Sequence, residues 1–89
     1  MMAIRSRRET AVFKYPFWIK SIGRTSPAGS YDVVIDEELI EGLSFPCYRR
    51  VGTAIMVPAE APFQSSLEMI SIGSFELADA QRIDAVRAR

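Results

Sequence analysis

The sequence lacks histidine, the side chain that most often acts as a general base or binds a metal near neutral pH. It has a single cysteine, Cys47, which excludes an intramolecular disulfide and fits a reducing compartment. No apolar run approaches the ~20 residues that a membrane-spanning helix needs. Because Cys47 has no histidine to act as its base, we interpret it as structural. We therefore expect a cytoplasmic protein with no membrane segment, no catalytic residue and no cofactor.

The chain also lacks net charge, because 11 Lys and Arg residues balance 11 Asp and Glu residues. A neutral chain has no overall electrostatic attraction for nucleic acid or an anionic membrane, which argues against both as partners. The arginines are nevertheless concentrated near the two ends, within residues 5–8 and 82–89. Nucleic-acid association through these terminal arginines is therefore kept as an alternative function, and its binding would weaken steeply with salt.

What is present is enough apolar sequence for one small domain. Hydrophobic residues make up 48% of the 89 positions, which is typical of a folded chain. A chain of this length buries only about two-thirds of its unfolded surface, so its core is thin and some apolar side chains stay exposed. We expect a homodimer, or an unidentified protein partner, to cover them. Residues 1–9 are predicted as a flexible basic arm, and residues 10–89 as the single domain.

Hydrophobic alternation predicts the strands. In the first segment, Ala11, Phe13 and Tyr15 share one side, and Pro16 indicates an edge strand or a bulge. The clearest strand signal is the alternation that begins at Tyr31. The predicted strands cover residues 10–19, 31–36, 47–57 and 67–72.

A closing helix is predicted from residue 75 to about residue 86, with Ser74 as its N-cap. Its apolar side is weak, since Phe75, Ile83 and Val86 lie together whereas Leu77 lies nearly opposite Phe75. We expect this helix to pack loosely, or against a partner. The fold class is therefore α+β, with a small, curved, mostly antiparallel sheet of about four strands. A small open barrel is the alternative.

The densest stretch of the chain runs from the acidic triplet at residues 36–38 to the arginine pair at residues 49–50. Asp36 can cap a helix and Gly42 can end one, which predicts one or two helical turns, with an irregular loop as the alternative. Three adjacent carboxylates also suggest a divalent cation. The spacing lacks the alternating oxygen ligands of a calcium loop, so we expect no metal.

The strand alternation separates the two arginines. Tyr48 and Arg50 share one face and Arg49 takes the other, so both arginines can act on one ligand only if the strand bulges. A small-ligand site between the acidic triplet at residues 36–38 and Arg49 or Arg50 is the second alternative function. We prefer the interpretation that these charges pair at the surface. On the same strand, the pattern places Val51 on one face with Thr53, Ile55 and Val57.

Two further aromatic positions are candidates for contact. The cluster at residues 15–18 is predicted to form core, with stacking of single-stranded bases as the alternative. If Trp18 is exposed instead, its surroundings become the best interface candidate. Phe63, within the loop at residues 58–66, either covers the core or projects outward. The candidate interaction residues are Trp18, Glu38, Tyr48, Arg50 and Phe63.

Several strings of the sequence resemble a group of short uncharacterised bacterial proteins. They are PAGSYDV at residues 27–33, DEELIEGLSFP at 36–46, YRR at 48–50 and SSLEM at 65–69. The resemblance covers roughly residues 10–80, and the stretch from residue 36 to residue 50 is its specific part. It implies a free-standing small protein, and it carries over no activity and no functional residue.

Overall fold

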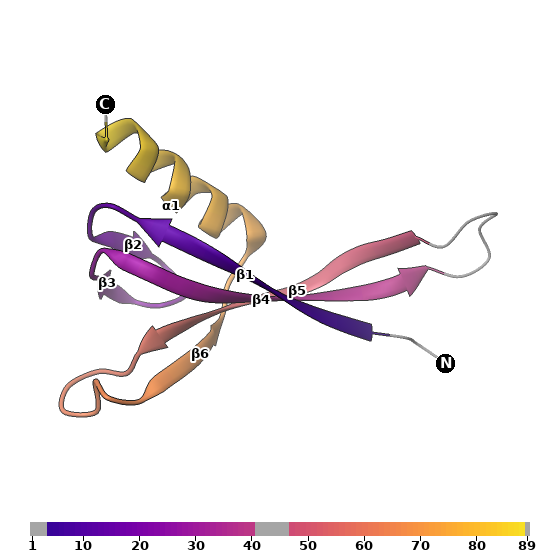
Figure 1. The fold of residues 1–89 in the computed structure, drawn as a ribbon, viewed down its shortest axis with the longest axis horizontal. Coiled ribbons are helices and arrows are strands. Elements are labelled where there is room, and N and C mark those ends of the chain that lie inside the picture. The colour runs from indigo at the N-terminus through magenta and orange to yellow at the C-terminus, as the bar shows by residue number, and fades with distance from the viewer. Residues whose placement is uncertain (1–3, 41–46, 89) are drawn as a thin grey trace.

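The computed structural model describes residues 4–40 and 47–88, which form a twisted antiparallel sheet with one helix (Figure 1). The strands form a sheet of order β1-β4-β5-β6 and a separate hairpin, β2-β3. The α+β prediction is confirmed, and the sheet is open rather than closed into a barrel. The elements are β1 (Ile4–Phe13), β2 (Phe17–Ile19), β3 (Arg24–Ser26), β4 (Gly29–Ile40), β5 (Cys47–Pro58), β6 (Leu67–Ser71) and α1 (Ser74–Arg87).

One face of the sheet carries the hydrophobic core, and the β2-β3 hairpin and α1 complete it. The alternation predicted from Tyr31 is confirmed, because Tyr31, Val33 and Ile35 are all buried. Their cross-strand neighbours on β5 include Ile55, which lies directly opposite Val33 and is 0% exposed. The buried apolar residues are Ala11, Phe13, Phe17, Ile19, Ile22, Tyr31, Val33, Ile35, Ile55, Val57, Ile72, Leu77 and Ala80.

Three aromatic rings lie at the centre of this core. The Phe13 and Phe17 rings stack with their centroids 3.8 Å apart, and the Tyr31 ring meets both of them edge-on. The Tyr31 hydroxyl donates a hydrogen bond to the Pro27 carbonyl oxygen, and burial raises the pKa of this phenol. The residues predicted as one strand over 10–19 thus form two strands in different sheets, joined through Pro16.

The side of helix α1 that packs against the rest of the protein is not its most apolar side. Leu77, Ala80 and Asp84 are buried, whereas the side that bears Phe75 and Ile83 faces solvent. The helix begins at Ser74 with Gly73 as its N-cap, so the prediction of Ser74 as the cap was wrong by one residue. Within the described residues no helix has the length and apolar content to cross a membrane.

The opposite face of the sheet, which we call the open face, has no buried residue among those described. Its side chains on β1 and β6 include Val12, Leu67 and Met69, which are 60%, 63% and 62% exposed. Met56 on β5 lies directly opposite Met69 and is half-buried. The described residues therefore build a layer over one side of the sheet only.

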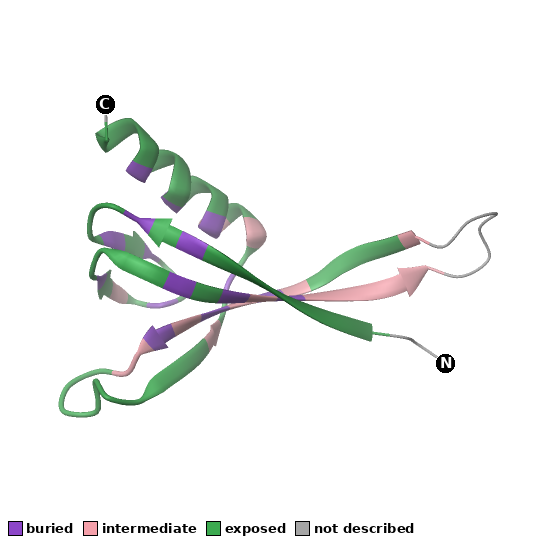
Figure 2. Cartoon of the chain, viewed as in Figure 1, coloured by how far each residue is buried: buried purple, intermediate pink, exposed green. Residues whose placement is uncertain are grey.

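Three strands continue beyond the core as a narrow ribbon, which we call the extension (Figure 1). It comprises residues 4–9 of β1, 36–40 of β4 and 47–51 of β5, and the remainder of the fold is the base. None of its residues is buried, as Figure 2 shows. The radius of gyration is 15.2 Å, against about 12 Å expected for a compact chain of this length.

The extension corrects two expectations from the sequence. The acidic triplet lies within β4 rather than in a helical turn, and the predicted helix end at Gly42 lies outside the described residues. Residues 4–9, expected to belong to a flexible arm, are the first part of β1 and pair with β4. The strands on both sides of β4 form hydrogen bonds with its backbone N–H and C=O groups. This pairing outweighs the local preference of an acidic run for the start of a helix.

A β-bulge marks the root of the extension. Asp36 lies opposite Gly52 and Glu37 lies opposite Arg50, so Val51 has no cross-strand partner in the register. The extra residue reverses the alternation of β5, and Val51 is 47% exposed. Arg50 therefore lies on the same face as Ile35 and Thr53, and Val51 is exposed rather than buried like Thr53.

Candidate interaction surface

The candidate residues from the sequence lie in three separate places. Trp18 is on β2 beside α1, and it is 59% exposed. Glu38, Tyr48 and Arg50 lie on the extension. Phe63 lies in the loop between β5 and β6 and is 66% exposed, so it projects outward rather than covering the core. The fold does not bring these five residues into one site.

The extension places Glu38 and Arg50 on opposite faces. Glu38 lies opposite Arg49, and the Arg49 Nη2 atom is 3.4 Å from Glu38 Oε2. Arg50 lies opposite Glu37 and shares a face with Tyr48, as the alternation predicted. Arg50 lines a cavity of about 140 Å³ under α1, and no residue of the acidic triplet lines that cavity. Glu38 and Arg50 therefore do not face each other, whereas Glu37 lies opposite Arg50 and Glu38 lies opposite Arg49.

Charged side chains on the core-side face of the extension bind one another. The Glu37 carboxylate accepts hydrogen bonds from Arg5 Nε at 3.1 Å and from Arg7 Nε at 3.2 Å. The Arg5 guanidinium also lies 3.6 Å above the centre of the Tyr48 ring. Arg7 further binds Glu9, and this hydrogen bond raises the pKa of Arg7. The N-terminal arginines are thus used within the chain, which weakens the argument for nucleic-acid binding.

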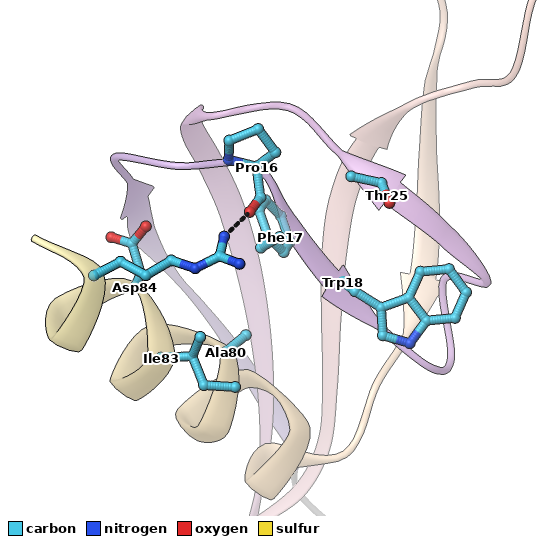
Figure 3. Close-up of a pocket in the computed structure, with 8 residues that line it drawn as sticks. Pro16, Phe17, Trp18, Thr25, Ala80, Ile83 and Asp84 are labelled. Carbon is cyan, nitrogen blue, oxygen red and sulfur yellow. Dashed lines mark hydrogen bonds between the residues drawn. The ribbon is translucent and has the colours of Figure 1, made fainter.

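A groove of about 400 Å³ separates the β2-β3 hairpin from α1 (Figure 3). Ala80 and Ile83 form its helix side, and Trp18 stands at its strand side. Trp18 is exposed here although its neighbour Phe17 is core, and Tyr15 is 38% exposed, so the prediction of a buried aromatic cluster was wrong for Trp18 and Tyr15. The groove is lined by Pro16, Phe17, Trp18, Thr25, Ala80, Ile83, Asp84 and Arg87.

The polar groups of this groove hold its walls together. The Asp84 carboxylate accepts hydrogen bonds from the backbone N–H of Lys14 and of Tyr15, at 2.9–3.1 Å. Arg87 Nη1 donates to the Pro16 carbonyl oxygen at 3.4 Å. Asp84 therefore ties α1 to the connection between β1 and β2, and what remains of the groove is mainly an apolar surface.

The open face provides a second apolar surface, at the other side of the sheet. Cross-strand pairing places Met56 beside Met69, and Pro58 beside Leu67. These residues lie along the edge of the sheet that β6 forms, since β6 is the last strand in the sheet order. The surface carries Leu67 and Met69 more than half exposed, next to a strand edge that no described strand covers.

Sequence reasoning missed Asp84, Leu67 and Met69. An acidic residue between Ile83 and Val86 was the only signal for a buried carboxylate, and it does not reveal which amides Asp84 meets. Residues 67–71 were predicted as a strand, but a strand pattern does not show whether the strand lies at an edge. Both facts depend on contacts between distant segments.

The described residues contain no group of three or more His, Cys, Asp or Glu side chains close enough to hold a metal ion. Comparison with protein-family models, with curated proteins and with solved structures finds no match for this chain. Function must therefore be argued from the surfaces themselves.

Proposed function

We propose that this chain is a small non-enzymatic interaction domain whose main partner is a second copy of itself. The observation that carries the proposal is the open face, an uncovered side of the sheet on which Leu67, Met69 and Met56 lie together next to an edge strand. A soluble antiparallel sheet usually presents polar side chains on a face that stays in water. An apolar group there instead marks a surface that gains stability when it is covered.

The size of the chain supports this proposal. Burial of apolar surface stabilises by roughly 25 cal/mol per Å², so a covered Leu67 or Met69 contributes more than an exposed one. The helix and the hairpin of this chain both lie on the core side of the sheet. No described segment remains to cover Leu67 and Met69 at the β6 edge of the open face, and a second chain is the nearest source of a cover.

The use of the charged groups supports a non-enzymatic role. A catalytic carboxylate or arginine must be available to a substrate. Asp84 instead binds two backbone amides, and Glu37 binds Arg5 and Arg7. The lone cysteine supports a reducing compartment, and we propose the cytoplasm.

The test is the mass of the purified chain in solution, measured by light scattering and sedimentation over a wide range of protein concentrations. We expect the mass to rise from one chain to two as concentration increases, because association follows mass action. A mass of one chain at every concentration would contradict self-association. A dimer that forms only after nucleic acid is added would favour the nucleic-acid alternative instead.

A further inference from the structure

We infer that the β6 edge is the dimer contact: two copies pair their β6 strands antiparallel, about a two-fold axis through Met69. The inference rests on the proposed self-association and names its surface. The joined strands would merge two four-stranded sheets into one continuous sheet. Four observations carry it, namely the charges of the two sheet edges, the direction of the β6 backbone groups, the self-complementary sequence of β6 and the position of α1.

The two edges of the sheet differ in charge. The β1 edge carries Arg5, Arg7 and Arg8 within four residues, and charged side chains on an edge discourage pairing with another strand. The β6 edge carries one charged residue, Glu68, whose carboxylate lies 3.2 Å from Arg24 Nη2 of the same chain. The β6 edge therefore lacks the protection that β1 has.

The backbone of β6 turns some of its hydrogen-bonding groups toward this edge, where no described strand pairs with them. Ile72 N–H donates to the Thr53 carbonyl at 2.9 Å, and Ala59 N–H donates to the Ser66 carbonyl at 2.9 Å. In an antiparallel ladder these bonds recur at every second residue, so Glu68 and Ile70 turn their N–H and C=O groups toward β5. Leu67, Met69 and Ser71 turn theirs outward, away from the sheet.

The outward groups of two copies match when the strands pair about Met69. Met69 then lies opposite Met69 of the second copy, and Leu67 lies opposite Ser71, so outward groups meet outward groups. Glu68 lies opposite Ile70, and no like charges face each other. The pairing is the same seen from either copy, as a two-fold contact requires.

Side chains add to the backbone pairing. Leu67 and Met69, exposed in the single chain, lie on the open face beside Pro58 and Met56. Pairing at β6 sets Met69 beside its own copy and Leu67 beside Ser71 of the second copy, so the edge-facing sides of these exposed side chains become covered. Helix α1 packs mainly on β1 and β2, so it leaves the β6 edge accessible.

A closed dimer, in which β6 pairs with β6, fits this edge better than an open filament, in which β6 pairs with β1 of the next copy. Pairing β6 with itself closes after two chains and removes the free β6 edge from both. Pairing β6 with the β1 edge of the next chain would continue into a filament, and it would set an apolar strand against an arginine-rich one. We therefore commit to the closed dimer.

Two variants test the contact in different ways, and both are made in the full chain. Met69→Lys places two like charges directly opposite each other, and we expect dimerisation to weaken by at least about tenfold. Ser71→Pro removes an outward N–H without changing the apolar side chains, and proline is tolerated on an edge strand. We expect this variant to lose the dimer too. Val12→Lys on the β1 edge, 60% exposed, is the matched control and should stay dimeric.

Amide hydrogen exchange supplies an independent measurement. As the wild-type chain is concentrated, the amides of Leu67, Met69 and Ser71 should become protected, whereas those of Glu68 and Ile70 are protected throughout. Circular dichroism must show that both variants remain folded. If a proline variant fails to fold, the amide pattern of the wild type still decides.

Each outcome separates the two proposals. A wild type that is monomeric at every concentration refutes self-association itself. A wild-type dimer that Met69→Lys and Ser71→Pro leave intact refutes the β6 contact alone. Loss of the dimer in Met69→Lys but not in Ser71→Pro shows stacking of open faces instead of edge pairing, which also overturns the inference. Growth into filaments overturns the closed two-fold arrangement.

Discussion

The base and the extension share the strands β1, β4 and β5 but are stabilised in different ways. In the base, alternate residues of β4 such as Val33 and Ile35 are 1% exposed and pack under α1 and the hairpin. In the extension the next residues on that face are Glu37 and Leu39, which are half-buried with no layer above them. Strand pairing alone thus continues the sheet, but only the base has a core.

The difference shows what an uncovered ribbon needs in place of a core. On the core-side face, Glu37 binds Arg5 and Arg7, and the Arg5 guanidinium stacks on Tyr48. Exposed ion pairs of this kind contribute little individually and are screened by salt. We therefore expect the extension to open locally at a much lower free energy than the base. The following predictions test this contrast.

The largest effect is expected from the centre of the base. Phe13→Ala removes a ring that is 2% exposed and stacks on Phe17, so it should lower the free energy of unfolding by about 3–5 kcal/mol. Denaturant unfolding followed by circular dichroism measures the change. Tyr48→Ala in the extension, at 38% exposed, should cost much less. Equal losses at the two positions would show that the extension is as important to stability as the core.

The next effect concerns the attachment of α1. Asp84→Ala leaves the part-buried backbone N–H groups of Lys14 and Tyr15 without their acceptor, which should cost about 1–3 kcal/mol. Asp84→Asn retains one acceptor oxygen and should cost less. Asp79→Ala, at an exposed position of the same helix, is the control and should be nearly neutral. If Asp84→Ala matched this control in denaturant unfolding, the tether between α1 and the base would be unimportant.

A smaller effect concerns the Tyr31 hydroxyl. Tyr31→Phe removes its hydrogen bond to the Pro27 carbonyl and should cost about 0.5–1.5 kcal/mol near neutral pH. Burial raises the pKa of Tyr31 in the folded state above its usual value of 10.0. The stabilisation from the neutral phenol is therefore complete below about pH 10, and it is lost as pH rises through the raised folded-state pKa.

Thermal unfolding of wild type and Tyr31→Phe at a series of alkaline pH values checks this direction. The stability difference between the two proteins should shrink as pH rises above about 10. The reason is that only the wild type must bury an ionising phenol. A difference that stays constant across this range would show that Tyr31 ionises as easily in the folded chain as in the unfolded one.

The smallest effect is expected in the extension. A double-mutant cycle of Arg5→Ala and Tyr48→Leu should give a coupling free energy of about 0.5–1 kcal/mol, since the cation lies over an exposed ring. Hydrogen exchange on the same variants should be faster in residues 36–40, with little change at Val33 or Ile55. A change that spreads equally into the base would mean that the two regions unfold as one unit.

Local patterns of the sequence predicted the base well. The alternation of Tyr31, Val33 and Ile35 is a property of neighbouring residues, because side chains of a strand take opposite faces in turn. The same reasoning correctly placed Tyr48 and Arg50 on one face and Arg49 on the other. Phe13 and Phe17 were identified as apolar, but their stacking needs two segments that the sequence did not show as separate strands.

The errors occur where distant segments meet. The acidic triplet has the composition of a helix start, yet β1 and β5 pair with it on both sides and hold it in β4. Val51 was expected beside the buried Thr53, but a bulge that alternation cannot reveal leaves Val51 without a cross-strand partner and exposed. Trp18 was expected in the core, but the hairpin turns it outward toward the groove with Ile83.

The sequence by itself determined the fold class, the strand alternation and the scarcity of catalytic side chains, because these follow from residue type and short spacing. Only the tertiary structure decided that β6 is an edge, that one face of the sheet stays open and that Asp84 binds the connection before β2. These features depend on which segments pack together. The free energy of that packing is shared among residues far apart in the chain, so no local pattern contains it.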